Sequence, residues 1–517
     1  MNASPRPPGP SEIISEVTGR SPMGQLKFRF PSPLPAPRLA DLRKSYVTGL
    51  DRTPSRLSVE IRKDIMICQR STTESGRLFA PWQVEGVGTQ FIGTATLGER
   101  PEPYNLSIEL ARGKLNDVRN QLADWKQMGL KVPADLDNLV GDALRAFVQA
   151  SLGRADQASS HAAAQKSLAL AASASLSLVE TYVGQVLQNR LTAGKLPTQL
   201  AIGLDGDVSG LAWAGKIVPS FNTAQLHCPW KALSPTEGKN RWEELDSQLA
   251  WATRKKLAIQ AGPLIDLRAG ALPDWIWLWS GDFDAIVGMA VDVVRQAVTR
   301  YRGKIPLWHL INRPGSTDIL GMSEEDQIRL TARLLQVARQ ADPSAQFLVG
   351  LDRPWAEWMA SSTFQLGPLH LADYLARAEL GMAGIALEIA PGYSSPGSHL
   401  RDLLDFSRML DLYAMLNYPL YLSIVMPSGT ALDPQADSHV NVEVDQWPSP
   451  PTDASQASIA ARWIALAVAK PFVRSVAWRQ LDDSSPHLYP HGGLVRPNQT
   501  PKPLLEWLRT FRADLLA

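Results

Sequence analysis

Several charged side chains in the second half of the chain follow short apolar runs with the composition of β-strands. Glu388 lies near the end of one run, and Asp266 and Asp352 end two others. Two carboxyl groups held close together can act as an acid and a nucleophile or base. Glu388 with Asp266, or Glu388 with Asp352, is therefore a candidate catalytic pair. No sequence motif marks either pair as catalytic. The alternative is a structural ion pair of Glu388 with Arg313 or Arg353.

Two further residues at these run ends, Asn312 and His227, together with Arg313, are candidates for contact with a substrate. His227 could act as a general base, or it could be a hydrogen-bonded core residue. Asp482 and Asp483 begin the last loop and could simply cap a turn. The polar residues that we expect at one end of the fold are Asp205, His227, Asp266, Asn312, Arg313, Asp352, Arg353, Glu388 and Asp482.

Cysteine and glycine patterns give no sign of a bound metal or cofactor. Cys68 and Cys228 are the two cysteines, and their separation matches neither a metal-binding motif nor a disulfide framework. No glycine-rich dinucleotide fingerprint follows the first expected strand of the second half. We therefore expect no metal and no cofactor.

Tryptophan is concentrated in the second half of the chain. Of 16 tryptophans, all but Trp82 and Trp125 lie at or beyond residue 213. Aromatic faces stack on the apolar faces of sugar rings, so tryptophans near strand ends are candidate ligand contacts. The alternative is that they pack in the core. The substrate-binding candidates are Trp279, Trp355 and Trp478, with Trp277 and Trp447 also near strand ends or loops.

The candidate residues lie in a region, residues 196–517, in which predicted strands and helices alternate regularly. A typical helical segment is 286–301, and the pattern predicts an α/β fold with parallel strands. Its length and strand count favour a closed (β/α)8 TIM barrel, with an open doubly wound sheet as the alternative. The eight expected strands are 200–206, 221–227, 256–264, 305–312, 345–352, 383–390, 421–427 and 473–481. We expect the inward-facing side chains to include Ile202, Leu264, Leu310, Ile385 and Leu422.

The first 195 residues have a different pattern. Residues 1–23 are rich in proline and serine and predict a flexible segment. Residues 24–195 predict a smaller α+β domain, in which a β-sandwich or sheet precedes helices at 136–151 and 155–190. This domain could bind carbohydrate, or it could brace the barrel.

The composition is that of a globular protein, with 44% hydrophobic and 20% charged residues and a net charge of +1. A balanced charge argues against nucleic acid as a partner, and no uncharged apolar run predicts a membrane span. No secretory signal is visible at the N-terminus, so a cytoplasmic location is the expectation. The oligomeric state is left open.

Several motifs in the second half resemble family 10 glycoside hydrolases, the endo-1,4-β-xylanases. These are Phe221-Asn222-Thr223 to Trp230, Leu272-Pro273-Asp274-Trp275, Val298 to Ile305, Asp342-Pro343-Ser344-Ala345, Gly384 to Leu387, and Gly492-Gly493-Leu494 with Pro501-Lys502-Pro503. Their order and spacing span about 300 residues and exclude residues 1–195. The resemblance implies a TIM barrel and carbohydrate as the partner.

The residues that the family uses for catalysis are not retained. Where the family has its acid/base Glu after Asn, this chain has Arg313 after Asn312. Ile424 stands where the family has its nucleophilic Glu, and Gly262 replaces a sugar-binding histidine. Arginine does not donate a proton near neutral pH, and isoleucine has no nucleophile. The resemblance therefore predicts that xylanase-type catalysis is lost.

Three classes of function remain open from the sequence. The protein could be a glycan-binding barrel without catalysis, that is, a pseudoenzyme. It could be an active O-glycoside hydrolase that uses Glu388 with Asp266 or Asp352. It could also be a structural or interaction scaffold, because a fold does not prescribe its function.

Overall fold

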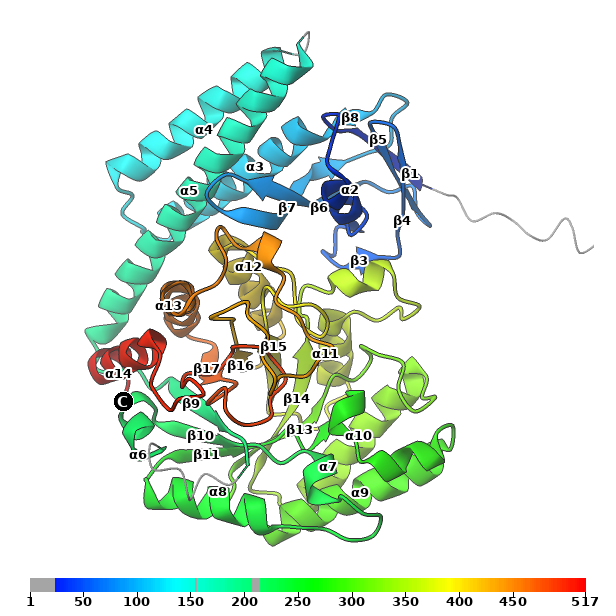
Figure 1. The fold of residues 1–517 in the computed structure, drawn as a ribbon, viewed down its shortest axis with the longest axis vertical. Helices are drawn as coiled ribbons and strands as arrows, with labels where there is room; N and C mark the ends of the chain where they lie inside the picture. Colours follow the sequence, from blue (N-terminus) through cyan, green and yellow to red (C-terminus); the bar gives the residue numbers. More distant parts are fainter. Residues whose placement is uncertain (1–23, 154–155, 207–213) are drawn as a thin grey trace, which may run out of the picture.

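A computed structural model of the protein describes residues 24–153, 156–206 and 214–517, so the segment 1–23 lies outside the described residues. The N-terminal part contains two four-stranded sheets, with strand orders β4-β5-β1-β8 and β3-β2-β6-β7 (Figure 1). The strands are β1 (Gly24–Arg29), β2 (Tyr46–Thr48), β3 (Pro54–Ser55), β4 (Ser58–Arg62), β5 (Ile65–Arg70), β6 (Gly76–Val84), β7 (Gly88–Leu97) and β8 (Tyr104–Asn105).

The two sheets share one hydrophobic core. Phe28 and Cys68 from the first sheet, Leu78 and Ile92 from the second, and Leu110 from the following helix belong to one buried cluster. Every second residue of β1 is buried, as expected for strands with one face toward a core. The predicted small β-rich unit followed by helices is confirmed.

Four helices complete the N-terminal part: α2 (Ala36–Leu42), α3 (Leu106–Gln127), α4 (Ala134–Leu152) and α5 (Gln157–Leu191). α5 has 35 residues and is long and apolar enough to cross a membrane by length and composition alone. Here it packs against α3 and α4 and also reaches two helices of the barrel. Its buried positions are mostly small, including Ser160, Ala164 and Ala171, which allows the helices to approach closely. These contacts are those of a core helix.

The second part is a closed parallel barrel. Its strands are β9 (Gln199–Leu204), β10 (Thr223–Leu226), β11 (Ala258–Ala261), β12 (Ile265–Asp266), β13 (Leu307–Asn312), β14 (Gln346–Asp352), β15 (Gly384–Ile389), β16 (Leu420–Ile424) and β17 (Val473–Trp478). These 9 strands follow the order β11-β10-β9-β17-β16-β15-β14-β13-β12. β11 and β12 both pair with β13, so they are two segments of one barrel position, which leaves eight positions. The eight-stranded TIM barrel is confirmed, and every strand except β12, which begins one residue after the predicted run 256–264, overlaps its predicted run.

Helices surround the strands and form the main core with them. They are α6 (Ala214–Ile217), α7 (Trp230–Leu233), α8 (Glu243–Arg254), α9 (Phe283–Arg300), α10 (Glu324–Ala341), α11 (Pro368–Arg377), α12 (Leu403–Ala414), α13 (Asp453–Ala469) and α14 (Pro503–Leu515). Short 3-10 turns include η3 (Asp274–Trp279), η4 (Glu357–Ala360) and η5 (Val444–Gln446). α10 begins with a capping box in which Ser323 and Asp326 satisfy each other's backbone N–H groups.

The barrel interior is more polar than we predicted from the sequence. Gln260 donates hydrogen bonds across the barrel to Ser475 Oγ at 3.0 Å and to Gln199 Oε1 at 2.5 Å. The prediction of the inward-facing residues was wrong. Those five residues belong instead to the large cluster that contains the helix side chains: Ile202, Leu264, Leu310, Ile385 and Leu422. Both faces of a barrel strand are buried, so alternation alone does not identify which face is inward.

The N-terminal part rests on the loops that leave the carboxyl ends of the barrel strands (Figure 1). Arg401, in the segment after β15, donates a hydrogen bond to the Tyr46 hydroxyl at 2.8 Å. His399 lies 3.0 Å from the backbone carbonyl of Thr89, and β7 contacts η5. One side of the barrel rim is therefore covered by the N-terminal part.

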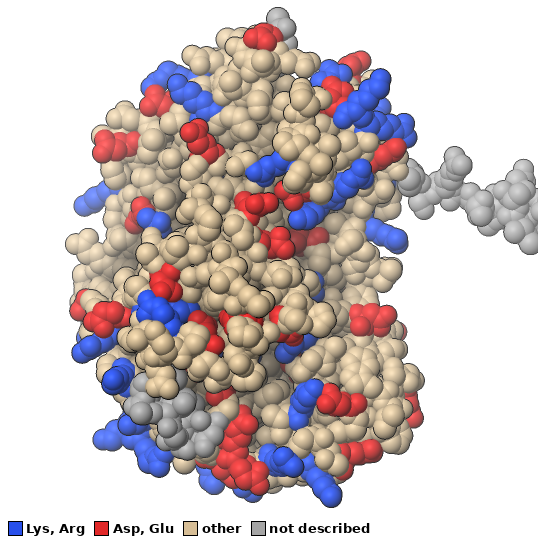
Figure 2. All heavy atoms as spheres, viewed as in Figure 1, with Lys and Arg blue, Asp and Glu red and all other residues tan. Residues whose placement is uncertain are grey.

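Charged side chains of both signs are intermingled over the face seen in Figure 2. The pattern agrees with the net charge of +1. Because no large patch of one sign is visible on this face, it offers no strong field to steer a polyanion.

Candidate functional site at the barrel mouth

A buried arginine links two carboxylates at the barrel mouth. Asp266 ends β12, Arg313 directly follows β13, and Glu388 lies in β15, so parallel strands bring all three to one end. Arg313 Nη2 lies 2.6 Å from Glu388 Oε2, and its Nε lies 3.4 Å from Asp266 Oδ1. The side chain of Arg313 is 2% exposed. The expected ion pair of Arg313 with a protein carboxylate is therefore present.

Both oxygens of Glu388 are engaged. Asn312 Nδ2 donates to Oε2 at 3.1 Å, alongside the guanidinium of Arg313. The Tyr489 hydroxyl donates to Oε1 at 2.7 Å. Tyr489 is buried and comes from the loop after β17. Sequence reasoning missed Tyr489, because nothing in its local spacing connects it to a strand end 101 residues away.

The carboxyl groups of Glu388 and Asp266 have pKa values that are shifted in opposite directions. Burial by itself would raise the pKa of Glu388, but Arg313, Arg479 and the Tyr489 hydroxyl together hold that pKa well below its ordinary value. Burial raises the pKa of Asp266, and Arg313 opposes that rise without cancelling it. Glu388 is thus a carboxylate at neutral pH, and it has no proton to donate.

Asp352 lies on the strand next to Glu388, but its carboxylate pairs with a different arginine. It pairs with Glu388 in the register of β14 and β15, yet its Oδ2 accepts a hydrogen bond from Arg353 Nε at 2.9 Å. Arg353 also donates to the carbonyl of Ser316 at 3.3 Å. Asp352 is 2% exposed. These contacts make Asp352 and Arg353 a buried structural pair.

His227 lies on the other side of the mouth, between Asp205 and Arg479. Its Nδ1 is 2.5 Å from Asp205 Oδ1, and its Nε2 is 3.3 Å from Arg479 Nη2. Because a guanidinium only donates, Nε2 accepts and Nδ1–H donates to the aspartate. Both ring nitrogens are then engaged, so no lone pair is available for a general base. Arg479 directly follows β17 and was absent from our sequence candidates.

The space left in the mouth is very small. The cavity bounded by Arg313, Glu388, His309 and Ser423 has a volume of about 30 Å³. Among the described residues, His309 Nε2 and Ser423 Oγ have no hydrogen-bond partner. A polar cavity of this size holds about one water molecule. A sugar ring does not fit.

Ile424 does not face the mouth, which corrects our sequence alignment. Ile424 is fully buried in the cluster between strands and helices, whereas its neighbour Ser423 lines the mouth cavity. Ser423 pairs with Glu388 in the register of β15 and β16, so the two side chains share a face. The inward position on this strand is therefore Ser423, which offers a hydroxyl rather than a carboxylate.

The candidate tryptophans are scattered rather than gathered at one site. Trp478 is 1% exposed and donates to the carbonyl of Gly492, so it offers no face to a ligand. Trp279 is half-buried in η3, next to Trp277, which is 41% exposed. Trp355 is half-buried and lines the contact with the N-terminal part. These positions do not form a tryptophan-lined cleft at the mouth.

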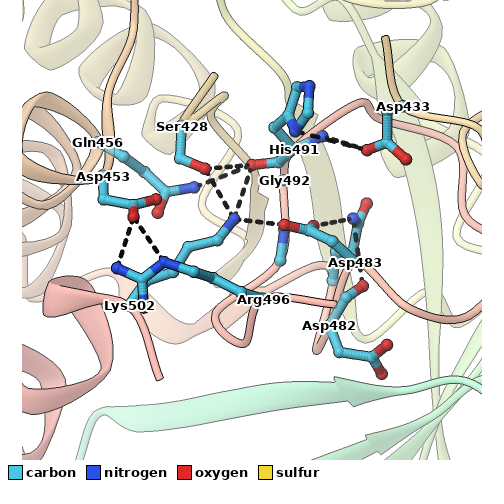
Figure 3. A network of polar contacts seen from close by, with 12 residues as sticks. Ser428, Asp433, Asp453, Gln456, Asp482, Asp483, His491, Gly492, Arg496 and Lys502 are labelled. Atoms are coloured by element: carbon cyan, nitrogen blue, oxygen red, sulfur yellow. Dashed lines mark hydrogen bonds and ion pairs between the residues drawn. The ribbon is translucent and has the colours of Figure 1, made fainter. Parts of the chain in front are cut away.

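A network of polar contacts fixes the loops above the mouth (Figure 3). Lys502 Nζ lies 2.5 Å from Asp483 Oδ2 and 2.7 Å from Ser428 Oγ, and it also donates to the carbonyl of His491 at 3.1 Å. Asp482 Oδ1 accepts the backbone N–H of Ser484 at 2.7 Å, so it caps a turn. The loops are thus held by buried charges.

Asp433, Asp483 and His487 bring potential metal-ligand atoms within 4.8 Å of one another. Asp483 is already paired with the ammonium group of Lys502, and its Oδ1 accepts the N–H of Gly493 at 2.7 Å. The ammonium group of Lys502 therefore supplies the positive charge that a metal ion would bring to this cluster.

No family model matches the chain. Among solved structures, it is similar to native xylanase 10B from Thermotoga maritima, with 14% identity and a TM-score of 0.46 over 64% of this chain and 98% of that one. It is also similar to a GH10 structure from Paenibacillus barcinonensis, with 17% identity and a TM-score of 0.47 over 63% of this chain and 96% of that one. The TIM barrel itself is established by its own strand pairing, and its likeness is to barrels of family 10 xylanases.

Proposed function

We propose that this protein binds carbohydrate without hydrolysing it, and that the barrel mouth has become part of the structural core. The observation that supports the loss of hydrolysis is the position of Arg313. Its guanidinium forms ion pairs with both Glu388 and Asp266, at N···O distances of 2.6 and 3.4 Å. A retaining glycosidase needs its two carboxyl groups about 5 Å apart with the sugar between them. Here an arginine contacts both carboxylates.

The filled mouth also requires carbohydrate to bind elsewhere on the surface. A cavity of about 30 Å³ supports a scaffold role for the barrel itself. Binding is then expected on aromatic side chains outside the mouth, such as Trp277, which is 41% exposed, or Trp355.

A second candidate function is hydrolysis by Glu388 and Asp266, and one observation favours it. Their pKa values are shifted in opposite directions, which is the pattern of an acid–base pair. In that case Asp266 would protonate the leaving oxygen and Glu388 would attack. The reaction would require Arg313 to leave both carboxylates, and the mouth to open.

Hydrolysis assays separate the two candidates. The purified protein is incubated with xylan and with an aryl xyloside, and released reducing ends and phenol are measured for the wild type, Glu388→Gln and Glu325→Gln. Glu325 is an exposed residue of α10 and serves as the matched control. We expect no turnover above background in all three. Robust turnover that Glu388→Gln abolishes and Glu325→Gln retains would overturn the proposal and establish the second candidate.

A further inference from the structure

The space around the candidate Trp355 lies between the two parts of the chain, not in the barrel mouth. A cleft of about 340 Å³ is bounded by β2, β6, β7 and α3 on one side. The loop after β14 and the helices α11 and α12 form the other side. Pockets for small ligands begin at roughly 300 Å³. The cleft is therefore large enough for a small molecule, whereas the mouth is not.

The walls of the cleft carry aromatic rings. Phe79 and Phe91 come from the N-terminal part, and Trp355 comes from the loop after β14. Phe79 stacks on Tyr46 with ring centroids 4.9 Å apart, and Phe91 meets the same tyrosine edge-on at 5.0 Å. These contacts hold the rings in place without a ligand. Rigid aromatic walls suit the apolar face of a ring-shaped ligand.

Three of the basic side chains that line the cleft are already neutralised. Asp117 bonds both Arg77 and Arg408, which joins the N-terminal part to α12. Lys114 bonds Asp402 in the same way. These three cations are each committed to a carboxylate of the chain. These three cations therefore have little capacity to bind an anionic ligand, whereas Arg52, which is exposed and also lines the cleft, makes glucuronate a necessary probe.

Asp405 is the carboxylate in the cleft with spare hydrogen-bonding capacity. Its Oδ2 is buried, lies 3.6 Å from Arg401 Nη1 and has no hydrogen-bond partner among the described residues, so a ligand in the cleft would meet Oδ1. Arg401 also forms an ion pair with Glu357 at 3.6 Å and donates a hydrogen bond to the Tyr46 hydroxyl at 2.8 Å. The Asp405 side chain is 32% exposed, more than Asp117 at 20%. Burial raises the pKa of Asp405, which agrees with a carboxyl group that lacks donors.

We propose that this cleft is a binding site for a neutral, hydroxyl-rich ring such as a pyranose sugar, with Asp405 accepting its hydroxyl groups. A sugar offers an apolar face to the half-buried Trp355 and several O–H donors to the carboxylate. Asn120 and Thr96, both exposed at the cleft, add neutral donors and acceptors. The inference rests on the proposed carbohydrate binding and gives it a location.

Calorimetric titration of the full-length protein tests the site with a fixed set of probes: methyl β-xylopyranoside, cellobiose, glucuronate and glucosamine. Asp405→Asn keeps the shape of the side chain and removes its charge. We expect this variant to bind the neutral sugar about 10- to 100-fold more weakly, because hydrogen bonds to charged groups contribute roughly 1.5–3 kcal/mol. Thr96→Trp places a large ring at an exposed edge of the cleft and should abolish binding. Asp284→Asn, at an exposed residue of α9, is the matched control and should bind as the wild type does.

Each outcome has a distinct meaning. Binding of a neutral sugar that both cleft variants weaken and the control retains supports the site. Binding that neither Asp405→Asn nor Thr96→Trp changes would refute the site but leave carbohydrate binding in place elsewhere. Preference for glucuronate or glucosamine would refute the neutral class of ligand. No binding of any neutral sugar would refute both the site and the proposed function, whereas the hydrolysis assay tests loss of catalysis independently.

Discussion

Replacing Arg313 with methionine should destabilise the fold strongly and reverse its dependence on pH. Arg313 lies 2.6 Å from Glu388 and 3.4 Å from Asp266 and is 2% exposed. At an effective dielectric constant of about 20, these separations correspond to attractions of about 6 and about 5 kcal/mol, most of which offsets the cost of burying the charges. Removing the cation leaves two buried carboxylates, and losing one partner of a buried pair costs about 3–5 kcal/mol. Arg313→Glu adds a third carboxylate and should be less stable still.

The pH dependence follows from the direction of the pKa shift. In the wild type, the folded-state pKa of Glu388 is lowered, so its contribution to stability is present above the unfolded pKa and is lost as the solution becomes acidic. In Arg313→Met, only Arg479 and the Tyr489 hydroxyl still oppose the effect of burial, so we expect that pKa to be raised. The contribution is then fullest below about pH 4.3 and is lost as the pH rises toward neutral. The difference in stability between wild type and variant should grow between pH 5 and pH 8, by about 1.4 kcal/mol per unit of pKa shift.

Urea unfolding followed by tryptophan fluorescence and circular dichroism at pH 5, 6.5 and 8 measures both effects. Arg333→Met, at an exposed arginine of α10, is the matched control and should change the unfolding free energy by less than about 0.5 kcal/mol. A loss below about 1 kcal/mol in Arg313→Met that is equal at pH 5 and pH 8 would refute the assignment of Arg313 as the counter-ion of the mouth.

Three further predictions concern stability. Burial holds the pKa of His399 at about 3. The unfolding free energy of the wild type should therefore fall as the pH drops from about 6.5 toward 3, by up to about 1.4 kcal/mol per pH unit. In urea titrations, His399→Gln should make this slope flatter. Gly350→Ala places a Cβ 1.9 Å from a buried imidazole nitrogen and should lower the melting temperature, whereas Gly184→Ala, in open space on α5, should raise stability by about 0.5–1 kcal/mol. Tyr489→Phe removes the hydroxyl donor to Glu388 and should cost about 1.5–3 kcal/mol in chemical unfolding; an unchanged midpoint would exclude that bond as a stabilising contact.

The barrel was predictable from the sequence because its signal is local and repeated. Each strand is a short β-branched or leucine-rich run, and each helix shows its own periodicity, as in α9. The side that each strand residue faces was not predictable. Ile385 and Ala386 are both apolar and both buried, yet Ile385 packs against helices and Ala386 lies in the small cluster with Leu307 and Leu348. Only the closed barrel determines which face is inward.

The candidate site was partly predictable for the same reason. Asp266, Arg313 and Glu388 lie at the ends of parallel strands, so the fold class alone brings them together. Tyr489 and the cleft around Asp405 depend on loops and on the packing of the N-terminal part. Such contacts join residues far apart in the chain and leave no periodic signal in the sequence.

The length of α5 has a consequence for how this protein could be divided or recombined. Its 35 residues span roughly 50 Å, and it packs on α3 and α4 along much of that length and on α12 and α13 through its C-terminal half. Ser175 donates to Asp402 at 2.8 Å, and Arg190 donates to the carbonyl of Val468 at 2.6 Å. A cut near residue 195 would therefore leave the barrel with the packing faces of two helices exposed to water. The two parts are not interchangeable modules, and a barrel transplanted into another protein would have to carry α5 with it.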